Sequence, residues 1–306
     1  MEIKGVILAS GLKRVEPDRR RRHRLLHDGT IRAVGQWYVS AEAPADLLAL
    51  LSLGVRPTCL DAAALYGLWV PLARGVHAFR PRAVGAPVPA PLAVQIRRRV
   101  DPESGELVPL PEPVDEERPR PPEPVVLHRP RLRTWPDDDP VPDLLLVLDH
   151  AARCLPTVKA AILIESALNQ GKLTRPGLSQ LLEGLPQKHR TPLSRVRSDA
   201  QSGTETAVRW WLEGRSVRVR TQVQLAPRIR VDLLVGTNWV IECDSRRFHD
   251  DPGSYLEDRR RDLALASRGY RVTRLTWEQV FLEWEATERM LRSMLLRREH
   301  RQVLRV

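Results

Sequence analysis

Residues 228–244 read RIRVDLLVGTNWVIECD. Two runs rich in β-branched and apolar residues flank a Gly-Thr-Asn tripeptide at 236–238, a pattern that predicts a β-hairpin with a three-residue loop. If the middle residue of the tripeptide is the centre of the loop, counting along both strands places Asp232 directly opposite Glu242. The segment therefore predicts two carboxylates that are direct neighbours across a pair of strands.

This pair of carboxylates needs a neutralising partner. Directly opposed residues have Cβ atoms about 4.5–5.5 Å apart, and like charges at that spacing are destabilising. Alternation along the second strand places Asp244 on the same face as Glu242, so three oxygen donors suit Mg²⁺ or Mn²⁺. Two alternatives stay open: the acids face water or pair with nearby arginines, or a one-residue slip in register separates them.

The flanks of the hairpin predict a larger mixed α/β unit. A helix is expected from Ser202 to about residue 212, and Glu205 within it is either a fourth carboxylate or the partner of Ser202 in a capping box. After the hairpin, a helix over 255–268 ends at a glycine, and a strand follows over 270–275. This order predicts a mixed sheet flanked by helices.

A set of spaced residues in this region carries a family resemblance. They are Glu205, Gln224, 231–232, 241–244, 248–249, 258–261 and 269–272. Together they resemble the very-short-patch-repair-like endonuclease family, a branch of the PD-(D/E)XK restriction-endonuclease fold. The resemblance implies that Asp232 and Glu242 bind the metal together with the backbone carbonyl of Cys243, and that Glu205 assists catalysis.

The sequence departs from the superfamily motif at one position. A lysine is expected two residues after Glu242, and Asp244 stands there instead. The lysine normally orients or activates the attacking water, so Asp244 is a catalytic candidate with an open role and the general base is unassigned. His249 is the candidate base because a neutral imidazole accepts a proton near pH 7, although a lone histidine is also common as a structural residue.

Three further residues are expected to support this site. Gln224 either polarises the attacking water or only ends a strand. Asp258 and Arg261 have i, i+3 spacing on one helix, so they orient His249 or a phosphate, or they form an ordinary helix ion pair.

The N-terminal residues predict a DNA-binding region. A helix is expected over 3–10, a basic helix over 18–26, and two short strands around a glycine-containing turn within 31–39, which is the order of a winged helix. Five arginines of the basic helix are expected to contact DNA: Arg19, Arg20, Arg21, Arg22 and Arg24. The alternative is a solvated charged face. Residues 35–39 and 62–68 resemble the DNA-binding region of AbiEi-type antitoxins.

The middle of the chain predicts helices and a proline-rich segment. Helices are expected over 45–53 and 58–68, with Thr58 and Asp61 spaced as a capping box. Sixteen of the 26 prolines fall within 81–142 and exclude long helices there, so strands and loops are expected. Further helices are expected over 143–152, 157–169 and 178–185. Four parts follow: a winged helix at 1–80, a proline-rich region with a flexible insert at 81–142, a helical connector at 143–200 and an endonuclease-like domain at 201–306.

Composition points to a polyanionic partner. The 306 residues include 49 Lys and Arg against 38 Asp and Glu, for a net charge of +11 and an isoelectric point near 10.3. Such a surface attracts nucleic acid, most simply duplex DNA, although a codon bias toward arginine gives the same composition. No small-molecule cofactor is expected, and a homodimer is compatible with the sequence.

The cysteines and the apolar runs suggest a compartment. Cys59, Cys154 and Cys243 show no CxxC or Cys/His ligand spacing, which argues against both a disulfide framework and a zinc site. No signal peptide and no long apolar segment is evident, so the expectation is a soluble cytoplasmic protein without membrane contact.

These features predict a Mg²⁺-dependent deoxyribonuclease, an endonuclease that a winged helix targets to DNA. The alternative is a DNA-binding regulator or antitoxin-like protein whose nuclease fold is inactive, which the missing lysine favours. A third interpretation is a structural nucleic-acid-binding protein whose acidic residues are coincidental.

Overall fold

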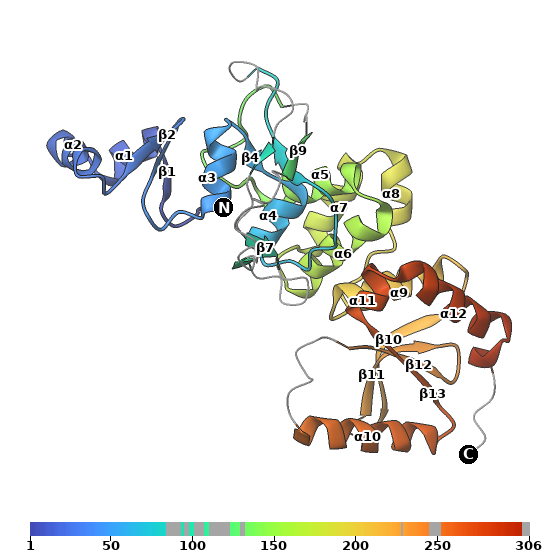
Figure 1. The fold of residues 1–306 in the computed structure, drawn as a ribbon. Coiled ribbons are helices and arrows are strands. Elements are labelled where there is room, and N and C mark those ends of the chain that lie inside the picture. The colour runs from blue at the N-terminus through green and yellow to red at the C-terminus, as the bar shows by residue number, and fades with distance from the viewer. Residues whose placement is uncertain are drawn as a thin grey trace. The chain divides into compact units, whose positions relative to one another are not determined.

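The computed structural model describes residues 1–83, 93–94, 98–100, 107–109, 123–128, 132–227, 229–244 and 252–301. Over these residues the chain is a mixed α/β structure with twelve α-helices and several small antiparallel and mixed sheets (Figure 1). It divides into two compact units: residues 1–154 with 179–186, and residues 155–178 with 187–306. Among the described residues, no helix combines the length and apolar character needed to cross a membrane.

The first unit begins with a small sheet and two helices: β1 (Val6–Leu8), α1 (Ala9–Val15), α2 (Arg19–His27), β2 (Arg32–Val34) and β3 (Trp37–Val39). The sheet has the order β1-β3-β2 and is antiparallel. The basic helix, which Asp18 caps through the amide of Arg20, and the hairpin after it are confirmed. The expected helix over 3–10 is wrong, because Val6 pairs with Val39 and Leu8 with Trp37 in the sheet.

The rest of the first unit contains α3 (Ala45–Ser52), β4 (Arg56–Pro57), α4 (Cys59–Leu65), β5 (Val76–Phe79), β6 (Ala93–Val94), β7 (Arg98–Val100), β8 (Leu107–Pro109), β9 (Glu123–His128) and α5 (Leu144–Cys154). One sheet has the order β4-β5-β9-β6, in which β5 and β9 are parallel, and β7 pairs with β8. Helices α3, α4 and α5 confirm the expected ones.

The expected capping box at the start of α4 is wrong. The side chain of Thr58 makes no capping hydrogen bond, and its hydroxyl lies 2.7 Å from Nδ1 of His150 instead. Asp61 accepts a hydrogen bond of 2.5 Å from the backbone amide of His77 on β5. Thr58 and Asp61 therefore bond to buried groups outside α4, and not to the backbone at the start of this helix as the capping-box pattern predicts.

The second unit contains α6 (Thr157–Asn169), α8 (Gln187–Leu193), α9 (Gly203–Glu213), β10 (Val219–Ala226), β11 (Ile229–Val235), β12 (Trp239–Asp244), α10 (Pro252–Ala266), β13 (Arg271–Thr276), α11 (Trp277–Phe281), α12 (Trp284–Leu296) and a 3₁₀ turn at Glu299–Arg301. The residues of α7 (Arg175–Gly184) are divided between the two units. The helix α6, expected in a separate connector, thus belongs to the same unit as the hairpin.

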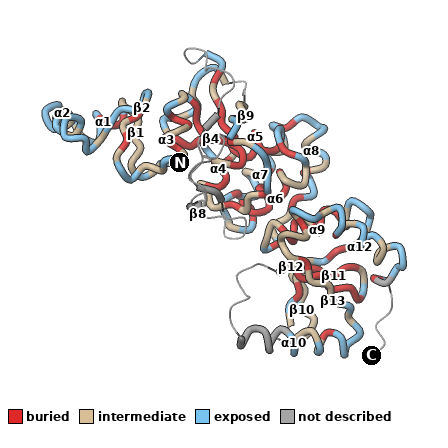
Figure 2. The backbone as a smooth tube through the Cα atoms, viewed as in Figure 1, coloured by how far each residue is buried: buried red, intermediate tan, exposed pale blue. Residues whose placement is uncertain are grey.

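A four-stranded mixed sheet with the order β10-β11-β12-β13 forms the centre of this unit. The expected hairpin register is confirmed, since Val235 pairs with Trp239 and Leu233 with Ile241, and β13 adds in parallel to β12. The inner strands are largely buried (Figure 2). Apolar residues of α9, α11 and α12 pack on one face of the sheet, and Leu265 of α10 packs on the other (Figure 1).

A buried ion pair joins α6 to α9. Glu165 and Arg209 are both fully buried and form a salt bridge. Glu165 also accepts hydrogen bonds from the Thr206 hydroxyl at 2.9 Å and from the Trp210 indole at 3.0 Å. Because α9 also carries Glu205 in its first turn, this pair fixes the helix from which one acidic side chain enters the hairpin region.

Candidate acidic site of the second unit

The hairpin register brings Asp232 and Glu242 together. The backbone amide of Asp232 donates to Oε2 of Glu242 at 3.4 Å, and the amide of Cys243 donates to Oδ2 of Asp232 at 2.9 Å. Glu242 is 4% exposed, whereas Asp232 is half-buried. The two carboxylates therefore lie across β11 and β12 as the count from the loop predicts.

Glu205 reaches the same group of carboxylates from the N-terminal turn of α9. Its backbone amide donates to the Ser202 hydroxyl at 3.1 Å, so Ser202 caps the helix. The side chain of Glu205 does not complete a capping box with Ser202 and instead accepts from the amide of Gln201 at 3.0 Å. The same oxygen, Oε2, accepts a second hydrogen bond from Gln222. Glu205 therefore both satisfies a backbone donor at the N-terminus of the helix and belongs to the acidic group.

Gln222 on β10 is the bridging residue that sequence reasoning missed. Its Nε2 donates to Glu205 at 2.9 Å and to Oδ1 of Asp232 at 3.2 Å. Gln224, the expected supporting glutamine, is exposed and donates to the carbonyl of Ala226.

The strand register explains the difference between the two glutamines. Because Thr221 pairs with Leu233 and Val223 with Val231, Gln222 is the residue that counting places opposite Asp232. Gln222 has φ of +51°, an uncommon backbone conformation for a residue other than glycine. A count from the Ala226–Ile229 pair would have placed Val223 opposite Asp232, and a register shift between Gln224 and Ala226 brings Gln222 to that position instead.

Burial and mutual repulsion change the acidity of two of these carboxyls. Burial, with the nearby charge of Asp232, raises the pKa of Glu205 to about 7. The same two causes, in the same order, raise the pKa of Glu242 to about 8 against the opposing effect of Arg261. The group therefore holds protons near neutral pH that ordinary carboxyls would have released.

Arg261 of α10 is a cation in contact with this group. Its Nη2 donates to Oε1 of Glu242 at 2.6 Å and also to the backbone carbonyl of Arg230. Arg261 thus contacts the acidic centre from the face of the sheet that α10 covers, whereas the sequence suggested a role toward His249, a phosphate or Asp258 and no contact with Glu242.

The remaining expected residues are less fully described. Asp244 pairs with Thr276 of β13 through the backbone, and the side chains of Asp244 and Asp258 lie outside what the structure describes. His249 falls outside the described residues altogether. Cys243 is half-buried beside Asp232.

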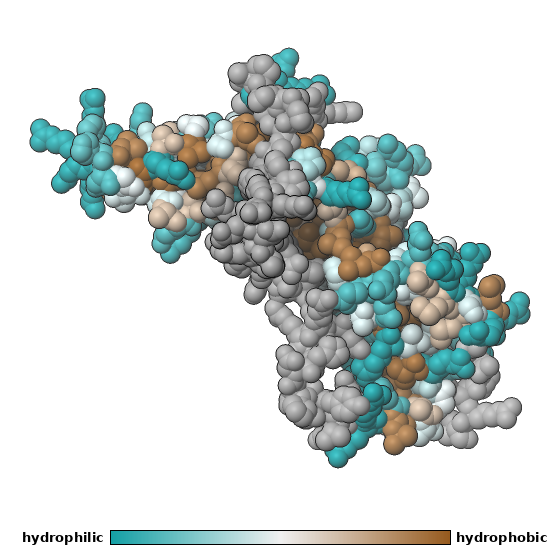
Figure 3. Space-filling view, viewed as in Figure 1, coloured by the Kyte–Doolittle hydropathy of each residue, from teal (hydrophilic) through white to brown (hydrophobic). Residues whose placement is uncertain are grey.

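The basic helix of the first unit offers a separate cationic surface. Arg19, Arg20 and Arg24 are exposed and make no ion pair with any described residue, whereas Arg21 pairs with Glu16 at 3.1 Å and Arg22 donates to backbone carbonyls. Hydrophilic side chains gather over α2 in the space-filling view (Figure 3). Three of the five arginines are therefore free to meet an anion.

Comparison with known proteins identifies no relative. No protein-family model, no curated protein and no solved structure matches this chain.

Proposed function

We propose that the second unit is a metal-dependent endonuclease that hydrolyses phosphodiester bonds in DNA. One observation carries the proposal: carboxylates from three elements, Glu205 on α9, Asp232 on β11 and Glu242 on β12, belong to one hydrogen-bonded group. A structural role alone gives no reason to gather three acids where burial and mutual repulsion oppose their ionisation.

The donor set fits Mg²⁺ or Mn²⁺. Both ions prefer carboxylate and carbonyl oxygens, and a dication would favour the ionised forms of carboxyls whose pKa is raised by burial and repulsion. The residues that would hold the ion are Asp232 and Glu242, with the carbonyl of Cys243 as a further ligand. When bound, such an ion supplies Lewis acidity and lowers the pKa of a bound water.

The side chains around this donor set have separable roles. Gln222 fixes the carboxylates of Glu205 and Asp232 relative to each other through its two hydrogen bonds. Glu205, with a pKa of about 7, is suited to accept a proton from the attacking water. Arg261 supplies positive charge beside Glu242, in a unit whose motif has Asp244 where the lysine is expected.

The basic helix α2 supports DNA as the substrate. Exposed arginines bind phosphate oxygens through their planar guanidinium groups, and the net charge of +11 favours association with a polyanion. We assign α2 and the strands after it the winged-helix role of holding the duplex.

The test is a cleavage assay with purified full-length protein. Supercoiled, linear, nicked, mismatched and single-stranded DNA are incubated with Mg²⁺ or Mn²⁺, with a chelator control. We expect cleavage by the wild-type protein, and we expect Asp232→Asn and Glu242→Gln to abolish it. Glu288→Gln, which replaces a partly exposed carboxylate on α12, should preserve cleavage. Cleavage that survives both site substitutions would overturn the proposed centre.

A second candidate function is an inactive nuclease fold that serves as a DNA-binding regulator. The ion pair between Arg261 and Glu242 favours it, because a guanidinium already occupies one oxygen of a proposed ligand. DNA binding without cleavage of any substrate in either metal would select this function over the first.

A further inference from the structure

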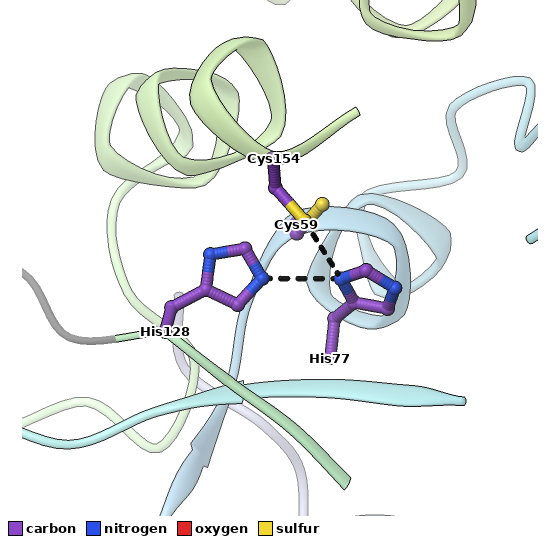
Figure 4. A group of neighbouring side chains, drawn as sticks. All are labelled: Cys59, His77, His128 and Cys154. Carbon is purple, nitrogen blue, oxygen red and sulfur yellow. Dashed lines mark hydrogen bonds between the residues drawn. The ribbon is translucent and has the colours of Figure 1, made fainter. Parts of the chain in front are cut away.

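Four side chains of the first unit form a second, unrelated cluster. Cys59, His77, His128 and Cys154 each offer one ligand atom, and these atoms all lie within 4.8 Å of one another (Figure 4). We propose that the four residues bind one Zn²⁺ ion in a tetrahedral Cys₂His₂ site.

The distances between ligand atoms agree with a single tetrahedral ion. Zn–S bonds of about 2.3 Å and Zn–N bonds of about 2.0–2.1 Å place two nitrogens about 3.3 Å apart and a sulfur and a nitrogen about 3.6 Å apart. Nδ1 of His77 lies 3.1 Å from Nε2 of His128 and 3.8 Å from Sγ of Cys154. Two histidine nitrogens and a sulfur therefore converge on one point with little adjustment.

Each ligand comes from a different secondary-structure element. Cys59 begins α4, His77 lies on β5, His128 ends β9 and Cys154 ends α5 (Figure 4). A tetrahedral site with four protein ligands has no open position for substrate, which is the form of a structural zinc site. The ion would therefore join two helices to two neighbouring strands.

Neighbouring side chains contact two of the four proposed ligand residues. The ring of His150 stacks on His128 with centroids 5.3 Å apart, and the hydroxyl of Thr58 lies 2.7 Å from Nδ1 of His150. Asp61 accepts from the backbone of His77 at 2.5 Å. These are the contacts that replace the expected capping box of α4.

The backbone at Cys59 gives independent support. Cys59 is fully buried and has φ of +52°, a conformation that is unfavourable for a residue with a side chain. Strained positions of this kind persist where the surrounding structure requires them and concentrate at functional sites. Here the strain directs a thiol toward two imidazoles and a second thiol.

The first experiment is metal analysis of full-length protein purified without chelator. We expect about one zinc ion per chain by inductively coupled plasma mass spectrometry. Replacement of the zinc with Co²⁺ should give the visible absorption bands of tetrahedral cobalt with thiolate ligands. Cys59→Ser and His128→Ala should lose the metal. Cys243→Ser, the third cysteine, and His27→Ala, an exposed histidine, are matched controls that should keep it.

A second measurement covers variants that fail to fold. In wild-type protein, one thiol should react with a thiol reagent before a chelator is added, and two more should react afterwards while zinc is released. The proposal is overturned if protein purified from zinc-supplemented cultures contains no zinc. It is also overturned if unreduced protein contains a disulfide between Cys59 and Cys154. Neither readout depends on nuclease activity, so this site and the proposed function are tested separately.

Discussion

Removing the carboxylate of Glu165 should destabilise the second unit more than any surface substitution. In Glu165→Ala, the guanidinium of Arg209 stays fully buried and keeps only Glu213, 2.8 Å away, as an anionic partner among the residues that the structure describes. The Trp210 indole and the Thr206 hydroxyl also lose their acceptor. Breaking a buried ion pair by removing one partner costs about 3–5 kcal/mol, a large part of the 5–15 kcal/mol that stabilises a typical domain.

Two controls separate the buried charge from the lost packing. Glu165→Met combined with Arg209→Met removes both charges, so this double variant should be clearly more stable than Glu165→Ala. Glu288→Ala breaks a partly exposed pair with Arg215 and should cost less than about 1 kcal/mol.

The measurement is urea unfolding of the full-length variants, followed by circular dichroism and tryptophan fluorescence. These signals follow the transition of the second unit, in which the Trp210 indole donates to Glu165. A loss below about 1 kcal/mol for Glu165→Ala would refute the reasoning. So would a double variant as unstable as the single one.

Three further predictions concern other parts of the chain. Gly236→Ala should lower the free energy of unfolding by about 1–3 kcal/mol in the same urea experiment, because Gly236 has φ of +62° and an added Cβ would meet the His300 carbonyl; a neutral effect would contradict this contact. Without metal, the folded forms of Glu205 and Glu242 keep protons that the unfolded chain releases near pH 4.5, so their contribution to stability is complete below that pH and is lost as pH rises through about 7 and about 8. The increase in melting temperature caused by Mn²⁺ should therefore grow from pH 6 to pH 8.5, and this pH dependence should be much weaker in Glu242→Gln. An increase that does not depend on pH in the wild-type protein would argue against these carboxylates as ligands. Replacing Arg20 and Arg24 together by Ala should weaken DNA binding across sequences and reduce the slope of log affinity against log salt by about 2, measured by fluorescence anisotropy; an unchanged slope would mean that α2 does not contact phosphate.

Local sequence patterns predict the hairpin because its register depends on few residues. Three loop residues and two apolar runs suffice to pair Val235 with Trp239, and the position of Asp232 relative to Glu242 follows. The same reasoning fails near the N-terminus, where β1 pairs with β3 about thirty residues later in the chain. A short apolar run does not itself distinguish a helix turn from a strand whose partner is distant.

The Cys/His cluster shows a different limit of sequence reasoning. Successive ligands along the chain lie 18, 51 and 26 positions apart, so no short sequence motif contains them. Their convergence depends on the parallel pairing of β5 with β9 and on the packing of two helices, which are long-range features. Spacing along the chain therefore excludes only zinc sites whose ligands are close in sequence.

The parallel pairing of β5 with β9 also has a consequence for the length of the chain between them. His77 pairs in register with Val126 and Phe79 with His128, so both ends of the intervening segment are held side by side. The entropic cost of closing a flexible loop rises by only about 0.6 kcal/mol for each doubling of its length. Residues inserted between β8 and β9, where both strands of the parallel pair stay intact, should therefore change the stability of the first unit little, which makes this position suitable for grafting a foreign domain or an affinity tag.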